Sequence, residues 1–332
     1  MSRPCRIAVD LLGAELPAAD LLNGAVDALE QHPNCELTFI CNRRELKPRV
    51  CASQRIVHCE HWVHEQDSLR EVLSERTQTS MHVGMHMLQD RAVDGFVSVG
   101  STGALMALGR HLLHTPNGID RPAVIKEFDG RRRPFWMLDL GANIVRKPST
   151  LHQFARLGVA YACRVGKVKK PRVALLNIGI EERKGPALLR DAAQMLDKSR
   201  DLDFVGFVEP SRIFDDTADV VVTDGYAGNI ALKSVEGTVN FIRDVFLHEL
   251  AEDSGNDAAK LIRKPARKRF RRLMKKLDSQ RHNGASFVGL NGVVVKSHNS
   301  TTQAGMTAAI DRAVCEVELH VPEKIEKFFN KE

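Results

Sequence analysis

Short apolar runs alternate with amphipathic helical patterns along most of the chain, and this alternation is what most constrains its fold. The runs are rich in β-branched residues, as buried strands are, and lie at 6–10, 36–41, 55–59, 95–99, 135–140, 172–178, 204–208, 219–223 and 292–296. Nearly all-apolar strands that alternate with helices are typical of a parallel sheet with both faces covered. The sequence therefore predicts an α/β fold with a parallel sheet between two layers of helices.

A helical segment interrupts this alternation near the C-terminal end. Residues 235–252 and 258–280 each have the pattern of a long helix, and Gly255 and Asn256 between them predict a turn. A strand at 292–296 and a helix over about 301–319 then return to the main body. We expect one α/β domain over 1–332 that carries a helical hairpin insertion at 235–280.

The positive charge of the chain is concentrated in the second arm of this hairpin. The net charge is +6, yet residues 260–276 hold ten Lys and Arg and no acid, so the remaining 38 basic residues face 42 acidic ones. A basic amphipathic helix suits an anionic membrane surface or an acidic protein, while a solvated arm packed on its sister helix is the alternative. Because base stacking could use only Phe270, we expect no nucleic acid. The contact residues expected within the arm (260–277) are Arg267, Lys268, Phe270, Arg271, Arg272, Leu273, Met274 and Lys275.

Composition and spacing argue against several other classes of protein. No apolar run approaches the roughly 20 residues of a transmembrane helix, and the N-terminal apolar run is too short for a signal peptide. Seven scattered cysteines form no C-x-x-C pair, so we expect reduced thiols in a cytoplasmic protein. The histidines at 58, 61, 64, 82 and 86 are expected at surfaces or interfaces. We expect no metal and no cofactor.

The sharpest local motif is the turn Gly100-Ser101-Thr102-Gly103, where an apolar strand leads directly into a helix. Two glycines allow a ligand to approach the backbone closely, and a helix N-terminus presents free N–H groups, which suits phosphate or another anion. A plain helix cap by Ser101 or Thr102 is the alternative. The spacings of the P-loop and of the dinucleotide-binding glycine motif are both missing.

Polar residues follow several other predicted strands, in each case close to glycine. Each alone is ordinary turn chemistry, but ligands in open α/β sheets bind at the carboxyl ends of strands. We therefore expect a polar, glycine-lined pocket around one end of the sheet. The residues concerned are Asp10, Asp139, Asn143, Asn177, Lys184, Asp224 and Asn229.

Ordered blocks over almost the whole chain resemble the bacterial phosphate acyltransferase family of phospholipid synthesis. They lie at 101–107, 118–123, 138–143, 175–179, 218–225 and 289–298. The resemblance implies a Rossmann-like α/β/α sandwich, similar to isopropylmalate dehydrogenases and phosphotransacetylases, in a homodimer whose hairpin associates peripherally with the membrane. It also implies transfer of a fatty acyl group from acyl carrier protein to inorganic phosphate, which gives an acyl phosphate.

This reaction needs neither a catalytic triad nor a metal, because phosphate is already an anionic nucleophile and a thiolate leaves readily. It needs an anion cradle, a cation and donors to the developing oxyanion. We expect the amides of the 100–103 turn to hold phosphate and Lys184 to orient it, with Asp224 and Asp10 as further catalytic groups. Asn143, Asn229 and His298 complete the expected substrate site, and the acidic carrier protein is expected to dock on the basic arm.

Several motif positions differ from the family pattern. Ala14 stands where the family has a second glycine, Ser101 where it has Asn, Ile180 where it has Glu and Pro186 where it has Asn. These differences leave open a protein of another class, a catalytically weak relative that binds the carrier protein or the membrane as a regulatory or assembly protein. Another α/β enzyme, such as an acetyl-transferring phosphotransacetylase or a dehydrogenase, is a further alternative.

Overall fold

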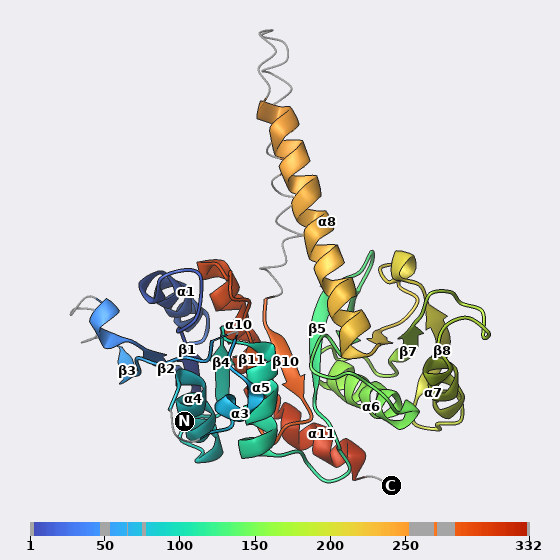
Figure 1. Ribbon diagram of the computed structural model, residues 1–332, viewed down its shortest axis with the longest axis horizontal. Helices are drawn as coiled ribbons and strands as arrows, with labels where there is room; N and C mark the ends of the chain where they lie inside the picture. Colours follow the sequence, from blue (N-terminus) through green and yellow to red (C-terminus); the bar gives the residue numbers. More distant parts are fainter. Residues whose placement is uncertain are drawn as a thin grey trace.

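A continuous sheet of 11 strands forms the body of the computed structural model, which describes residues 3–46, 54–64, 66–74, 78–251, 269–270 and 283–330 (Figure 1). The strands are β1 (Cys5–Asp10), β2 (Cys35–Cys41), β3 (Arg55–His58), β4 (Gly95–Ser98), β5 (Ala123–Asp129), β6 (Pro134–Leu138), β7 (Arg172–Leu176), β8 (Asp203–Val208), β9 (Val220–Val222), β10 (Ala285–Val288) and β11 (Val293–Lys296). Their order across the sheet is β3-β2-β1-β4-β11-β10-β5-β6-β9-β7-β8. The predicted strand runs are thus confirmed, with shifts of a few residues at their ends.

Helices cover both faces of this sheet. They are α1 (Ala18–Gln31), α3 (Leu69–Val72), α4 (Ser80–Gln89), α5 (Thr102–Leu108), α6 (Pro148–Arg164), α7 (Ala187–Asp197), α8 (Gly225–Ala251), α10 (Gln303–Glu318) and α11 (Val321–Phe329). One face is covered by α1 and α10 over the first half and by α6, α7 and α11 over the second. The other face packs against α3, α4, α5 and the start of α8. The predicted α/β/α architecture is confirmed.

The sheet is mixed rather than parallel throughout. Strands β3, β2, β1, β4 and β11 run parallel to one another, and so do β6, β9, β7 and β8. Between these halves, β10 and β5 are antiparallel to both of their neighbours, so the two halves run in opposite directions. The prediction of a parallel sheet is therefore wrong at the centre. Sequence analysis missed both central strands, because charged residues interrupt β5 and β10 has only four residues.

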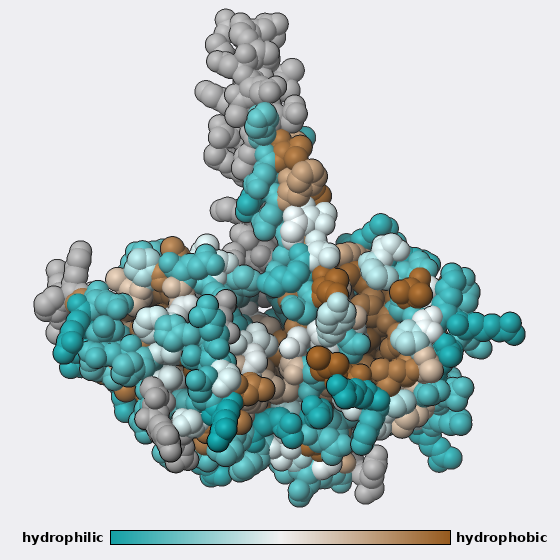
Figure 2. Space-filling model, viewed as in Figure 1, coloured by the Kyte–Doolittle hydropathy of each residue, from teal (hydrophilic) through white to brown (hydrophobic). Residues whose placement is uncertain are grey.

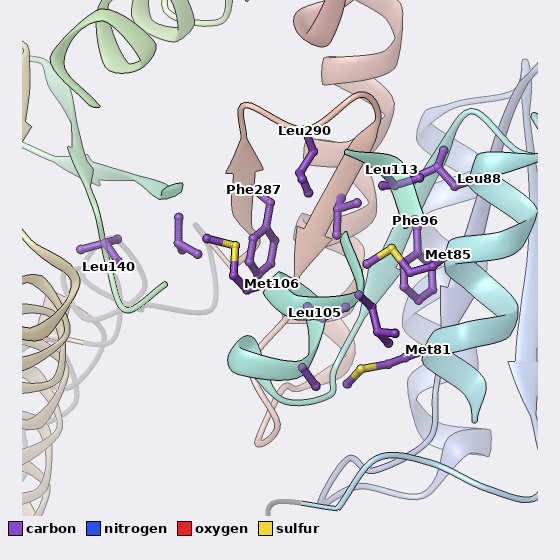
Figure 3. Packing of buried hydrophobic residues seen from close by; sticks show 14 of the residues in the cluster. Met81, Met85, Leu88, Phe96, Leu105, Met106, Leu113, Leu140, Phe287 and Leu290 are labelled. Carbon is purple, nitrogen blue, oxygen red and sulfur yellow. The ribbon is translucent and has the colours of Figure 1, made fainter. Parts of the chain in front are cut away.

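Packing between α4 and β4 fixes the turn that follows β4 (Figure 3). Met81 and Met85 of α4 lie against Phe96 of β4 in one buried cluster. A Cβ at Gly100 would overlap the Met81 side chain. Glycine at position 100 therefore lets the chain leave β4 close beneath α4, which positions the 100–103 turn.

Helix α8 projects from the body, and it begins at Gly225 rather than at 235 as predicted (Figure 1). The glycines at 225 and 228 suggest a turn, but in the structure they lie within the helix, where a Cβ at either position would overlap the 139–143 segment. Glycine is therefore needed at positions 225 and 228 for close packing of α8 on this segment, and not for a turn. No helix among the described residues is long and apolar enough to cross a membrane.

The predicted second arm of the hairpin falls largely outside the described residues. This applies to Arg267, Lys268, Arg271, Arg272, Leu273, Met274 and Lys275. Phe270 is described and buried, with its ring stacked on that of Phe246 at a centroid distance of 3.6 Å. Phe270, which is one of the residues expected to contact the carrier protein or the membrane, thus packs against α8.

Two glycine substitutions test the packing of the helices. A Cβ at Gly24 of α1 would overlap the backbone of Gln303 at the start of α10, so Gly24→Ala should lower the free energy of unfolding by about 1–3 kcal/mol. Gly237 lies inside α8 with nothing within 4 Å of a Cβ, so Gly237→Ala should raise it by about 0.5–1 kcal/mol. Denaturant unfolding measures both changes. Equal changes in the two variants would contradict the packing described here.

Candidate functional site

Four polar side chains lie in one row across the middle of the sheet, on the face covered by α4, α5 and α8. The register pairs Asp10 of β1 with Ser98 of β4, and Ser98 with Lys296 of β11. Lys296 in turn pairs with Ala285 of β10, and the register of β10 with β5 places Lys126 beside Ala285. We call Asp10, Ser98, Lys296 and Lys126 the polar row.

Asp10 holds one side of the 100–103 turn. Its carboxylate is fully buried and accepts hydrogen bonds from the Leu12 amide at 3.0 Å and the Ser98 hydroxyl at 2.8 Å. The Ser98 oxygen also accepts a hydrogen bond from the Gly100 amide at 3.1 Å. Burial raises the pKa of Asp10 to about 6, although these hydrogen bonds act in the opposite direction.

Lys296 holds the same turn from the other side. Its ammonium group donates to the carbonyl of Val99 at 3.0 Å, to the carbonyl of Ser297, and to the side-chain oxygen of Asn299 at 3.2 Å. These three bonds use all of its protons. Burial, and then the nearby charge of Lys233, lower the pKa of Lys296 to about 8. Lys296 therefore places a positive charge beside the turn and also orders its backbone.

Further cations gather next to the polar row around one carboxylate. Glu236 of α8 lies 3.6 Å from the Lys126 ammonium and 3.1 Å from that of Lys233. The Lys233 nitrogen also lies 3.0 Å from Nε2 of His298. Burial lowers the pKa of both Lys126 and His298. Two ammonium groups, those of Lys126 and Lys233, share a single carboxylate, so this pair, which we call the cation cluster, favours binding of an anion.

The 100–103 turn leads into α5, and its first amide, that of Gly100, donates to Ser98. Ser101 occupies the N-cap position of α5, but in this described segment its hydroxyl accepts no hydrogen bond from the first helical turn. The Ser101 side chain therefore does not cap α5. Gly100, Ser101 and Thr102 are half-buried and Gly103 is exposed, so a ligand can approach the turn from solvent.

The polar side chains around the start of α8 form hydrogen bonds with neighbouring groups. Asp139 is buried and accepts hydrogen bonds from the amides of Val124, Ala142 and Asn143 at 2.7–3.2 Å, and burial raises its pKa. Asn143 donates from its side chain to Asp139 at 2.9 Å and to a backbone carbonyl at 2.8 Å. Asp224 accepts a hydrogen bond from the Ala227 amide at 2.7 Å and so caps α8.

Lys184 lies in the segment that follows β7. Its ammonium lies 2.7 Å from Glu181, and this hydrogen bond raises the pKa of Lys184. Its carbonyl accepts a hydrogen bond from the Asn177 side chain at 3.1 Å. β7 and β9 run opposite to β1, β4 and β11, but the register continues the polar row through Val221 of β9 and Ala174 of β7, so the strands of both halves end within two residues of this row. That the polar strand ends together form one pocket stays a prediction.

Helix α8 links the groups of site residues described above. Asn229, Lys233 and Glu236 recur at helical spacing along it. Asn229 is exposed beside the turn at Gly141, whereas Lys233 and Glu236 reach the cation cluster. A different side of α8 lines a cavity of about 900 Å³, whose other walls include Leu176, Leu189 and Phe214.

Four residues of the site are absent from the sequence-based predictions: Lys296, Lys126, Lys233 and Glu236. Lys296 ends the apolar run Val293-Val294-Val295, which is the same signal that identified Asp10. Lys126 lies in a strand that was not recognised. The two helical residues gave no signal of their own, because charges at such spacing are common on solvated helices.

Two histidines whose spacing could suggest a metal site make other contacts. His82 takes part in the capping box of α4 with Thr79, and the His86 ring lies 3.2 Å from Gln89. Within the described ranges, no group of three or more His, Cys, Asp or Glu side chains is arranged to hold a metal ion.

The fold is shared with a phosphotransacetylase and with a dehydrogenase. A phosphotransacetylase from Streptococcus pyogenes superimposes with a TM-score of 0.63 at 13% identity, over 96% of this chain and 95% of that chain. A 4-hydroxythreonine-4-phosphate dehydrogenase from Klebsiella pneumoniae gives 0.54 at 11% identity, over 96% and 98%. At such identities the likeness establishes a Rossmann-type α/β fold alone.

Sequence comparison is more specific. Residues 5–324 match the family model described as fatty acid synthesis protein. A phosphate acyltransferase from Marinobacter nauticus is 36% identical over 98% of this chain and 96% of its own length, and one from Coxiella burnetii is 35% identical over 97% and 95%. The chain belongs to this fatty acid synthesis protein family, and it is an acyltransferase.

The buried carboxylate of the polar row should be visible in the pH dependence of stability. Because the pKa of Asp10 rises from 3.8 to about 6 on folding, the native state binds the extra proton, and stability from this group falls as pH rises from about 4 to 6. Asp10→Asn removes this loss, so its stability relative to the natural protein should increase by about 2–3 kcal/mol over that range. Denaturant unfolding at several pH values measures the difference. The exposed Glu30→Gln is the control, and an identical pH dependence in both variants would contradict the assignment.

Proposed function

We propose that this protein transfers a fatty acyl group from the thioester of acyl carrier protein to inorganic phosphate. A phosphate oxygen attacks the thioester carbonyl, the C–S bond breaks, and the carrier leaves as a thiolate that takes up a proton. The products are an acyl phosphate and the free carrier, and the acyl phosphate serves phospholipid synthesis. Family membership supports acyl transfer, and the names of the relatives support phosphate as the acceptor.

The observation that carries this proposal is that Lys126 and Lys233 meet at Glu236, close to Lys296, which itself bonds the backbone at the start of the 100–103 turn. Phosphate needs positive charge for binding and a fixed position for attack, and the three lysines with the turn amides supply both. In this arrangement Lys126 and Lys233 take the orienting role that sequence analysis gave to Lys184. Asp10 is a positioning residue, because it acts on the turn through Ser98.

We further propose that the acidic carrier protein and an anionic membrane surface contact the basic arm at 260–277, in a cytoplasmic homodimer. Toward its C-terminal end, α8 exposes Phe241, Ile242 and Val245, and Figure 2 shows apolar surface on the projecting helix. Apolar side chains beside a basic segment suit peripheral contact with lipid.

Acyl phosphate formation by the purified protein tests the reaction. With palmitoyl carrier protein, phosphate should give palmitoyl phosphate and free carrier thiol in equal amounts. Lys233→Met should raise KM for phosphate roughly tenfold or more, because it removes a charged partner of the anion. Lys198→Met, on the exposed end of α7, is the matched control. A folded protein that forms no acyl phosphate overturns the proposal, and an unchanged KM in Lys233→Met removes the assigned phosphate site.

The pH dependence of the reaction tests Lys296. Its pKa in the folded protein is about 8, so the positive charge beside the turn is present below that pH and lost above it. Activity at saturating acyl donor should therefore fall as pH rises through about 8. Lys296→Arg keeps its charge at high pH and should move this decline upward by at least one pH unit. Circular dichroism checks that the variant is folded. A decline at the same pH in the folded variant contradicts the role of Lys296.

A further inference from the structure

Two cysteines lie side by side at the first residues of two neighbouring parallel strands. The register pairs Cys5 of β1 with Cys35 of β2, and the Cys5 amide donates to the carbonyl of Asn34 at 3.0 Å. Both side chains belong to the same hydrophobic cluster, on the face of the sheet that α1 and α10 cover. The two cysteines therefore face each other across one strand spacing.

The spacing of this pair suits a disulfide. Neighbouring strands lie about 4.8 Å apart. The Cα atoms that a disulfide joins are usually about 4.4–6.8 Å apart, so the strand spacing falls within that range. The Cys5 thiol is already hydrogen-bonded to Cys35. The two sulfur atoms can therefore be joined without a large movement of the backbone.

The hydrogen bond makes the two thiols chemically different. It raises the pKa of Cys5 and lowers the pKa of Cys35, against which burial acts in the opposite direction. Cys5 is 8% exposed, whereas Cys35 is half-buried. A cavity of about 950 Å³, which Cys5 and Asn34 help to line, leaves room for a small oxidant beside them. Because the thiolate is the form that reacts with oxidants, Cys35 is the attacking thiol of the pair.

The other cysteines are arranged differently. The Cys59 amide donates to the carbonyl of Cys41 at 3.1 Å, but the two side chains pack in clusters on opposite faces of the sheet. Two further cysteines lie on the helices α6 and α10. In the part of the chain that the structure describes, Cys5 and Cys35 are the only cysteines that the strand register places face to face.

We propose that Cys5 and Cys35 are a redox modification site, at which a peroxide converts the two thiols into a reversible disulfide. The Cys35 thiolate attacks one oxygen of hydrogen peroxide, the O–O bond breaks, and the released hydroxide takes up a proton to give water. The Cys5 sulfur then attacks the Cys35 sulfenic acid, so the S–S bond forms, the S–O bond breaks, and hydroxide leaves as water with the Cys5 proton. The two thiols are oxidised together, and one peroxide is reduced to two water molecules.

The disulfide would join β1 to β2 at their amino ends and close residues 5–35, with α1 among them, into a loop. Asp10 lies at the other end of β1, so this site is separate from the polar row and does not depend on the proposed function. A cross-link of this kind restricts the unfolded chain and so stabilises the folded one.

Oxidation of the reduced full-length protein with hydrogen peroxide tests the proposal. Peptide mapping by mass spectrometry should find residue 5 joined to residue 35, and dithiothreitol should restore all seven thiols. The Tm of the oxidised protein should rise by about 5 °C or more, because a loop of roughly 30 residues is closed. A natural protein that forms no 5–35 linkage, or that joins either cysteine to another cysteine or to a second copy of the chain, overturns the proposal.

Serine variants separate the two steps. Cys5→Ser should stop at the sulfenic acid of Cys35, which dimedone traps, and should gain no Tm on oxidation. Cys35→Ser should leave the Cys5 thiol reduced. Cys41→Ser, which changes a buried cysteine of the same strand and cluster, is the matched control and should form the 5–35 linkage as the natural protein does. Circular dichroism checks that each variant is folded. A gain in Tm that persists in folded Cys5→Ser, or peroxide that leaves Cys35 unmodified in it, contradicts the assigned roles.

Discussion

The close packing of α8 against the 139–143 segment determines how the rest of the site is arranged. Gly225 and Gly228 lack the Cβ atoms that would collide with that segment, so the helix can start directly at the end of β9. Asp224 caps it, and the buried Asp139 orders the segment beneath it. From this fixed start, one side of α8 brings Lys233 and Glu236 to the polar row, while another side lines the apolar cavity.

The electrostatics of the site follow from burial. Asp10, Lys126 and Lys296 would lose much hydration energy, and the shifted pKa values of all three reflect that loss. Hydrogen bonds to the turn and the charge of Glu236 offset part of this cost. Because the lysines outnumber the carboxylates around them, an incoming anion stabilises charges that the empty site holds at an energetic cost. The same groups that keep the turn in place are therefore suited to bind an anion.

The sequence was sufficient for the layers of the fold but not for the direction of the sheet. Buried strands such as β4 and β7 are apolar on both faces, so their composition identifies them. The reversal at the centre depends on which strands pair, and β5 carries Lys126 and Glu127 because its lysine belongs to the site and its glutamate pairs with Arg312. Asp10 and the 100–103 turn could be found from strand ends and glycine. Lys233 could not, because its role depends on the path of α8 over the sheet.

The two sides of α8 also matter for the positions at which this sequence differs from the family motifs. Pro186 lines the apolar cavity, and Ile180, 56% exposed, lies in the segment between Ile178 and Pro186, which both border it. Asp10, Ser98, Lys126 and Lys296, which hold the turn and its charge, are on the other side of the helix. These two substitutions thus lie on the cavity side of α8 and leave the cations in place. Ser101, in contrast, stands in the 100–103 turn itself, so that difference changes a side chain of the proposed anion site.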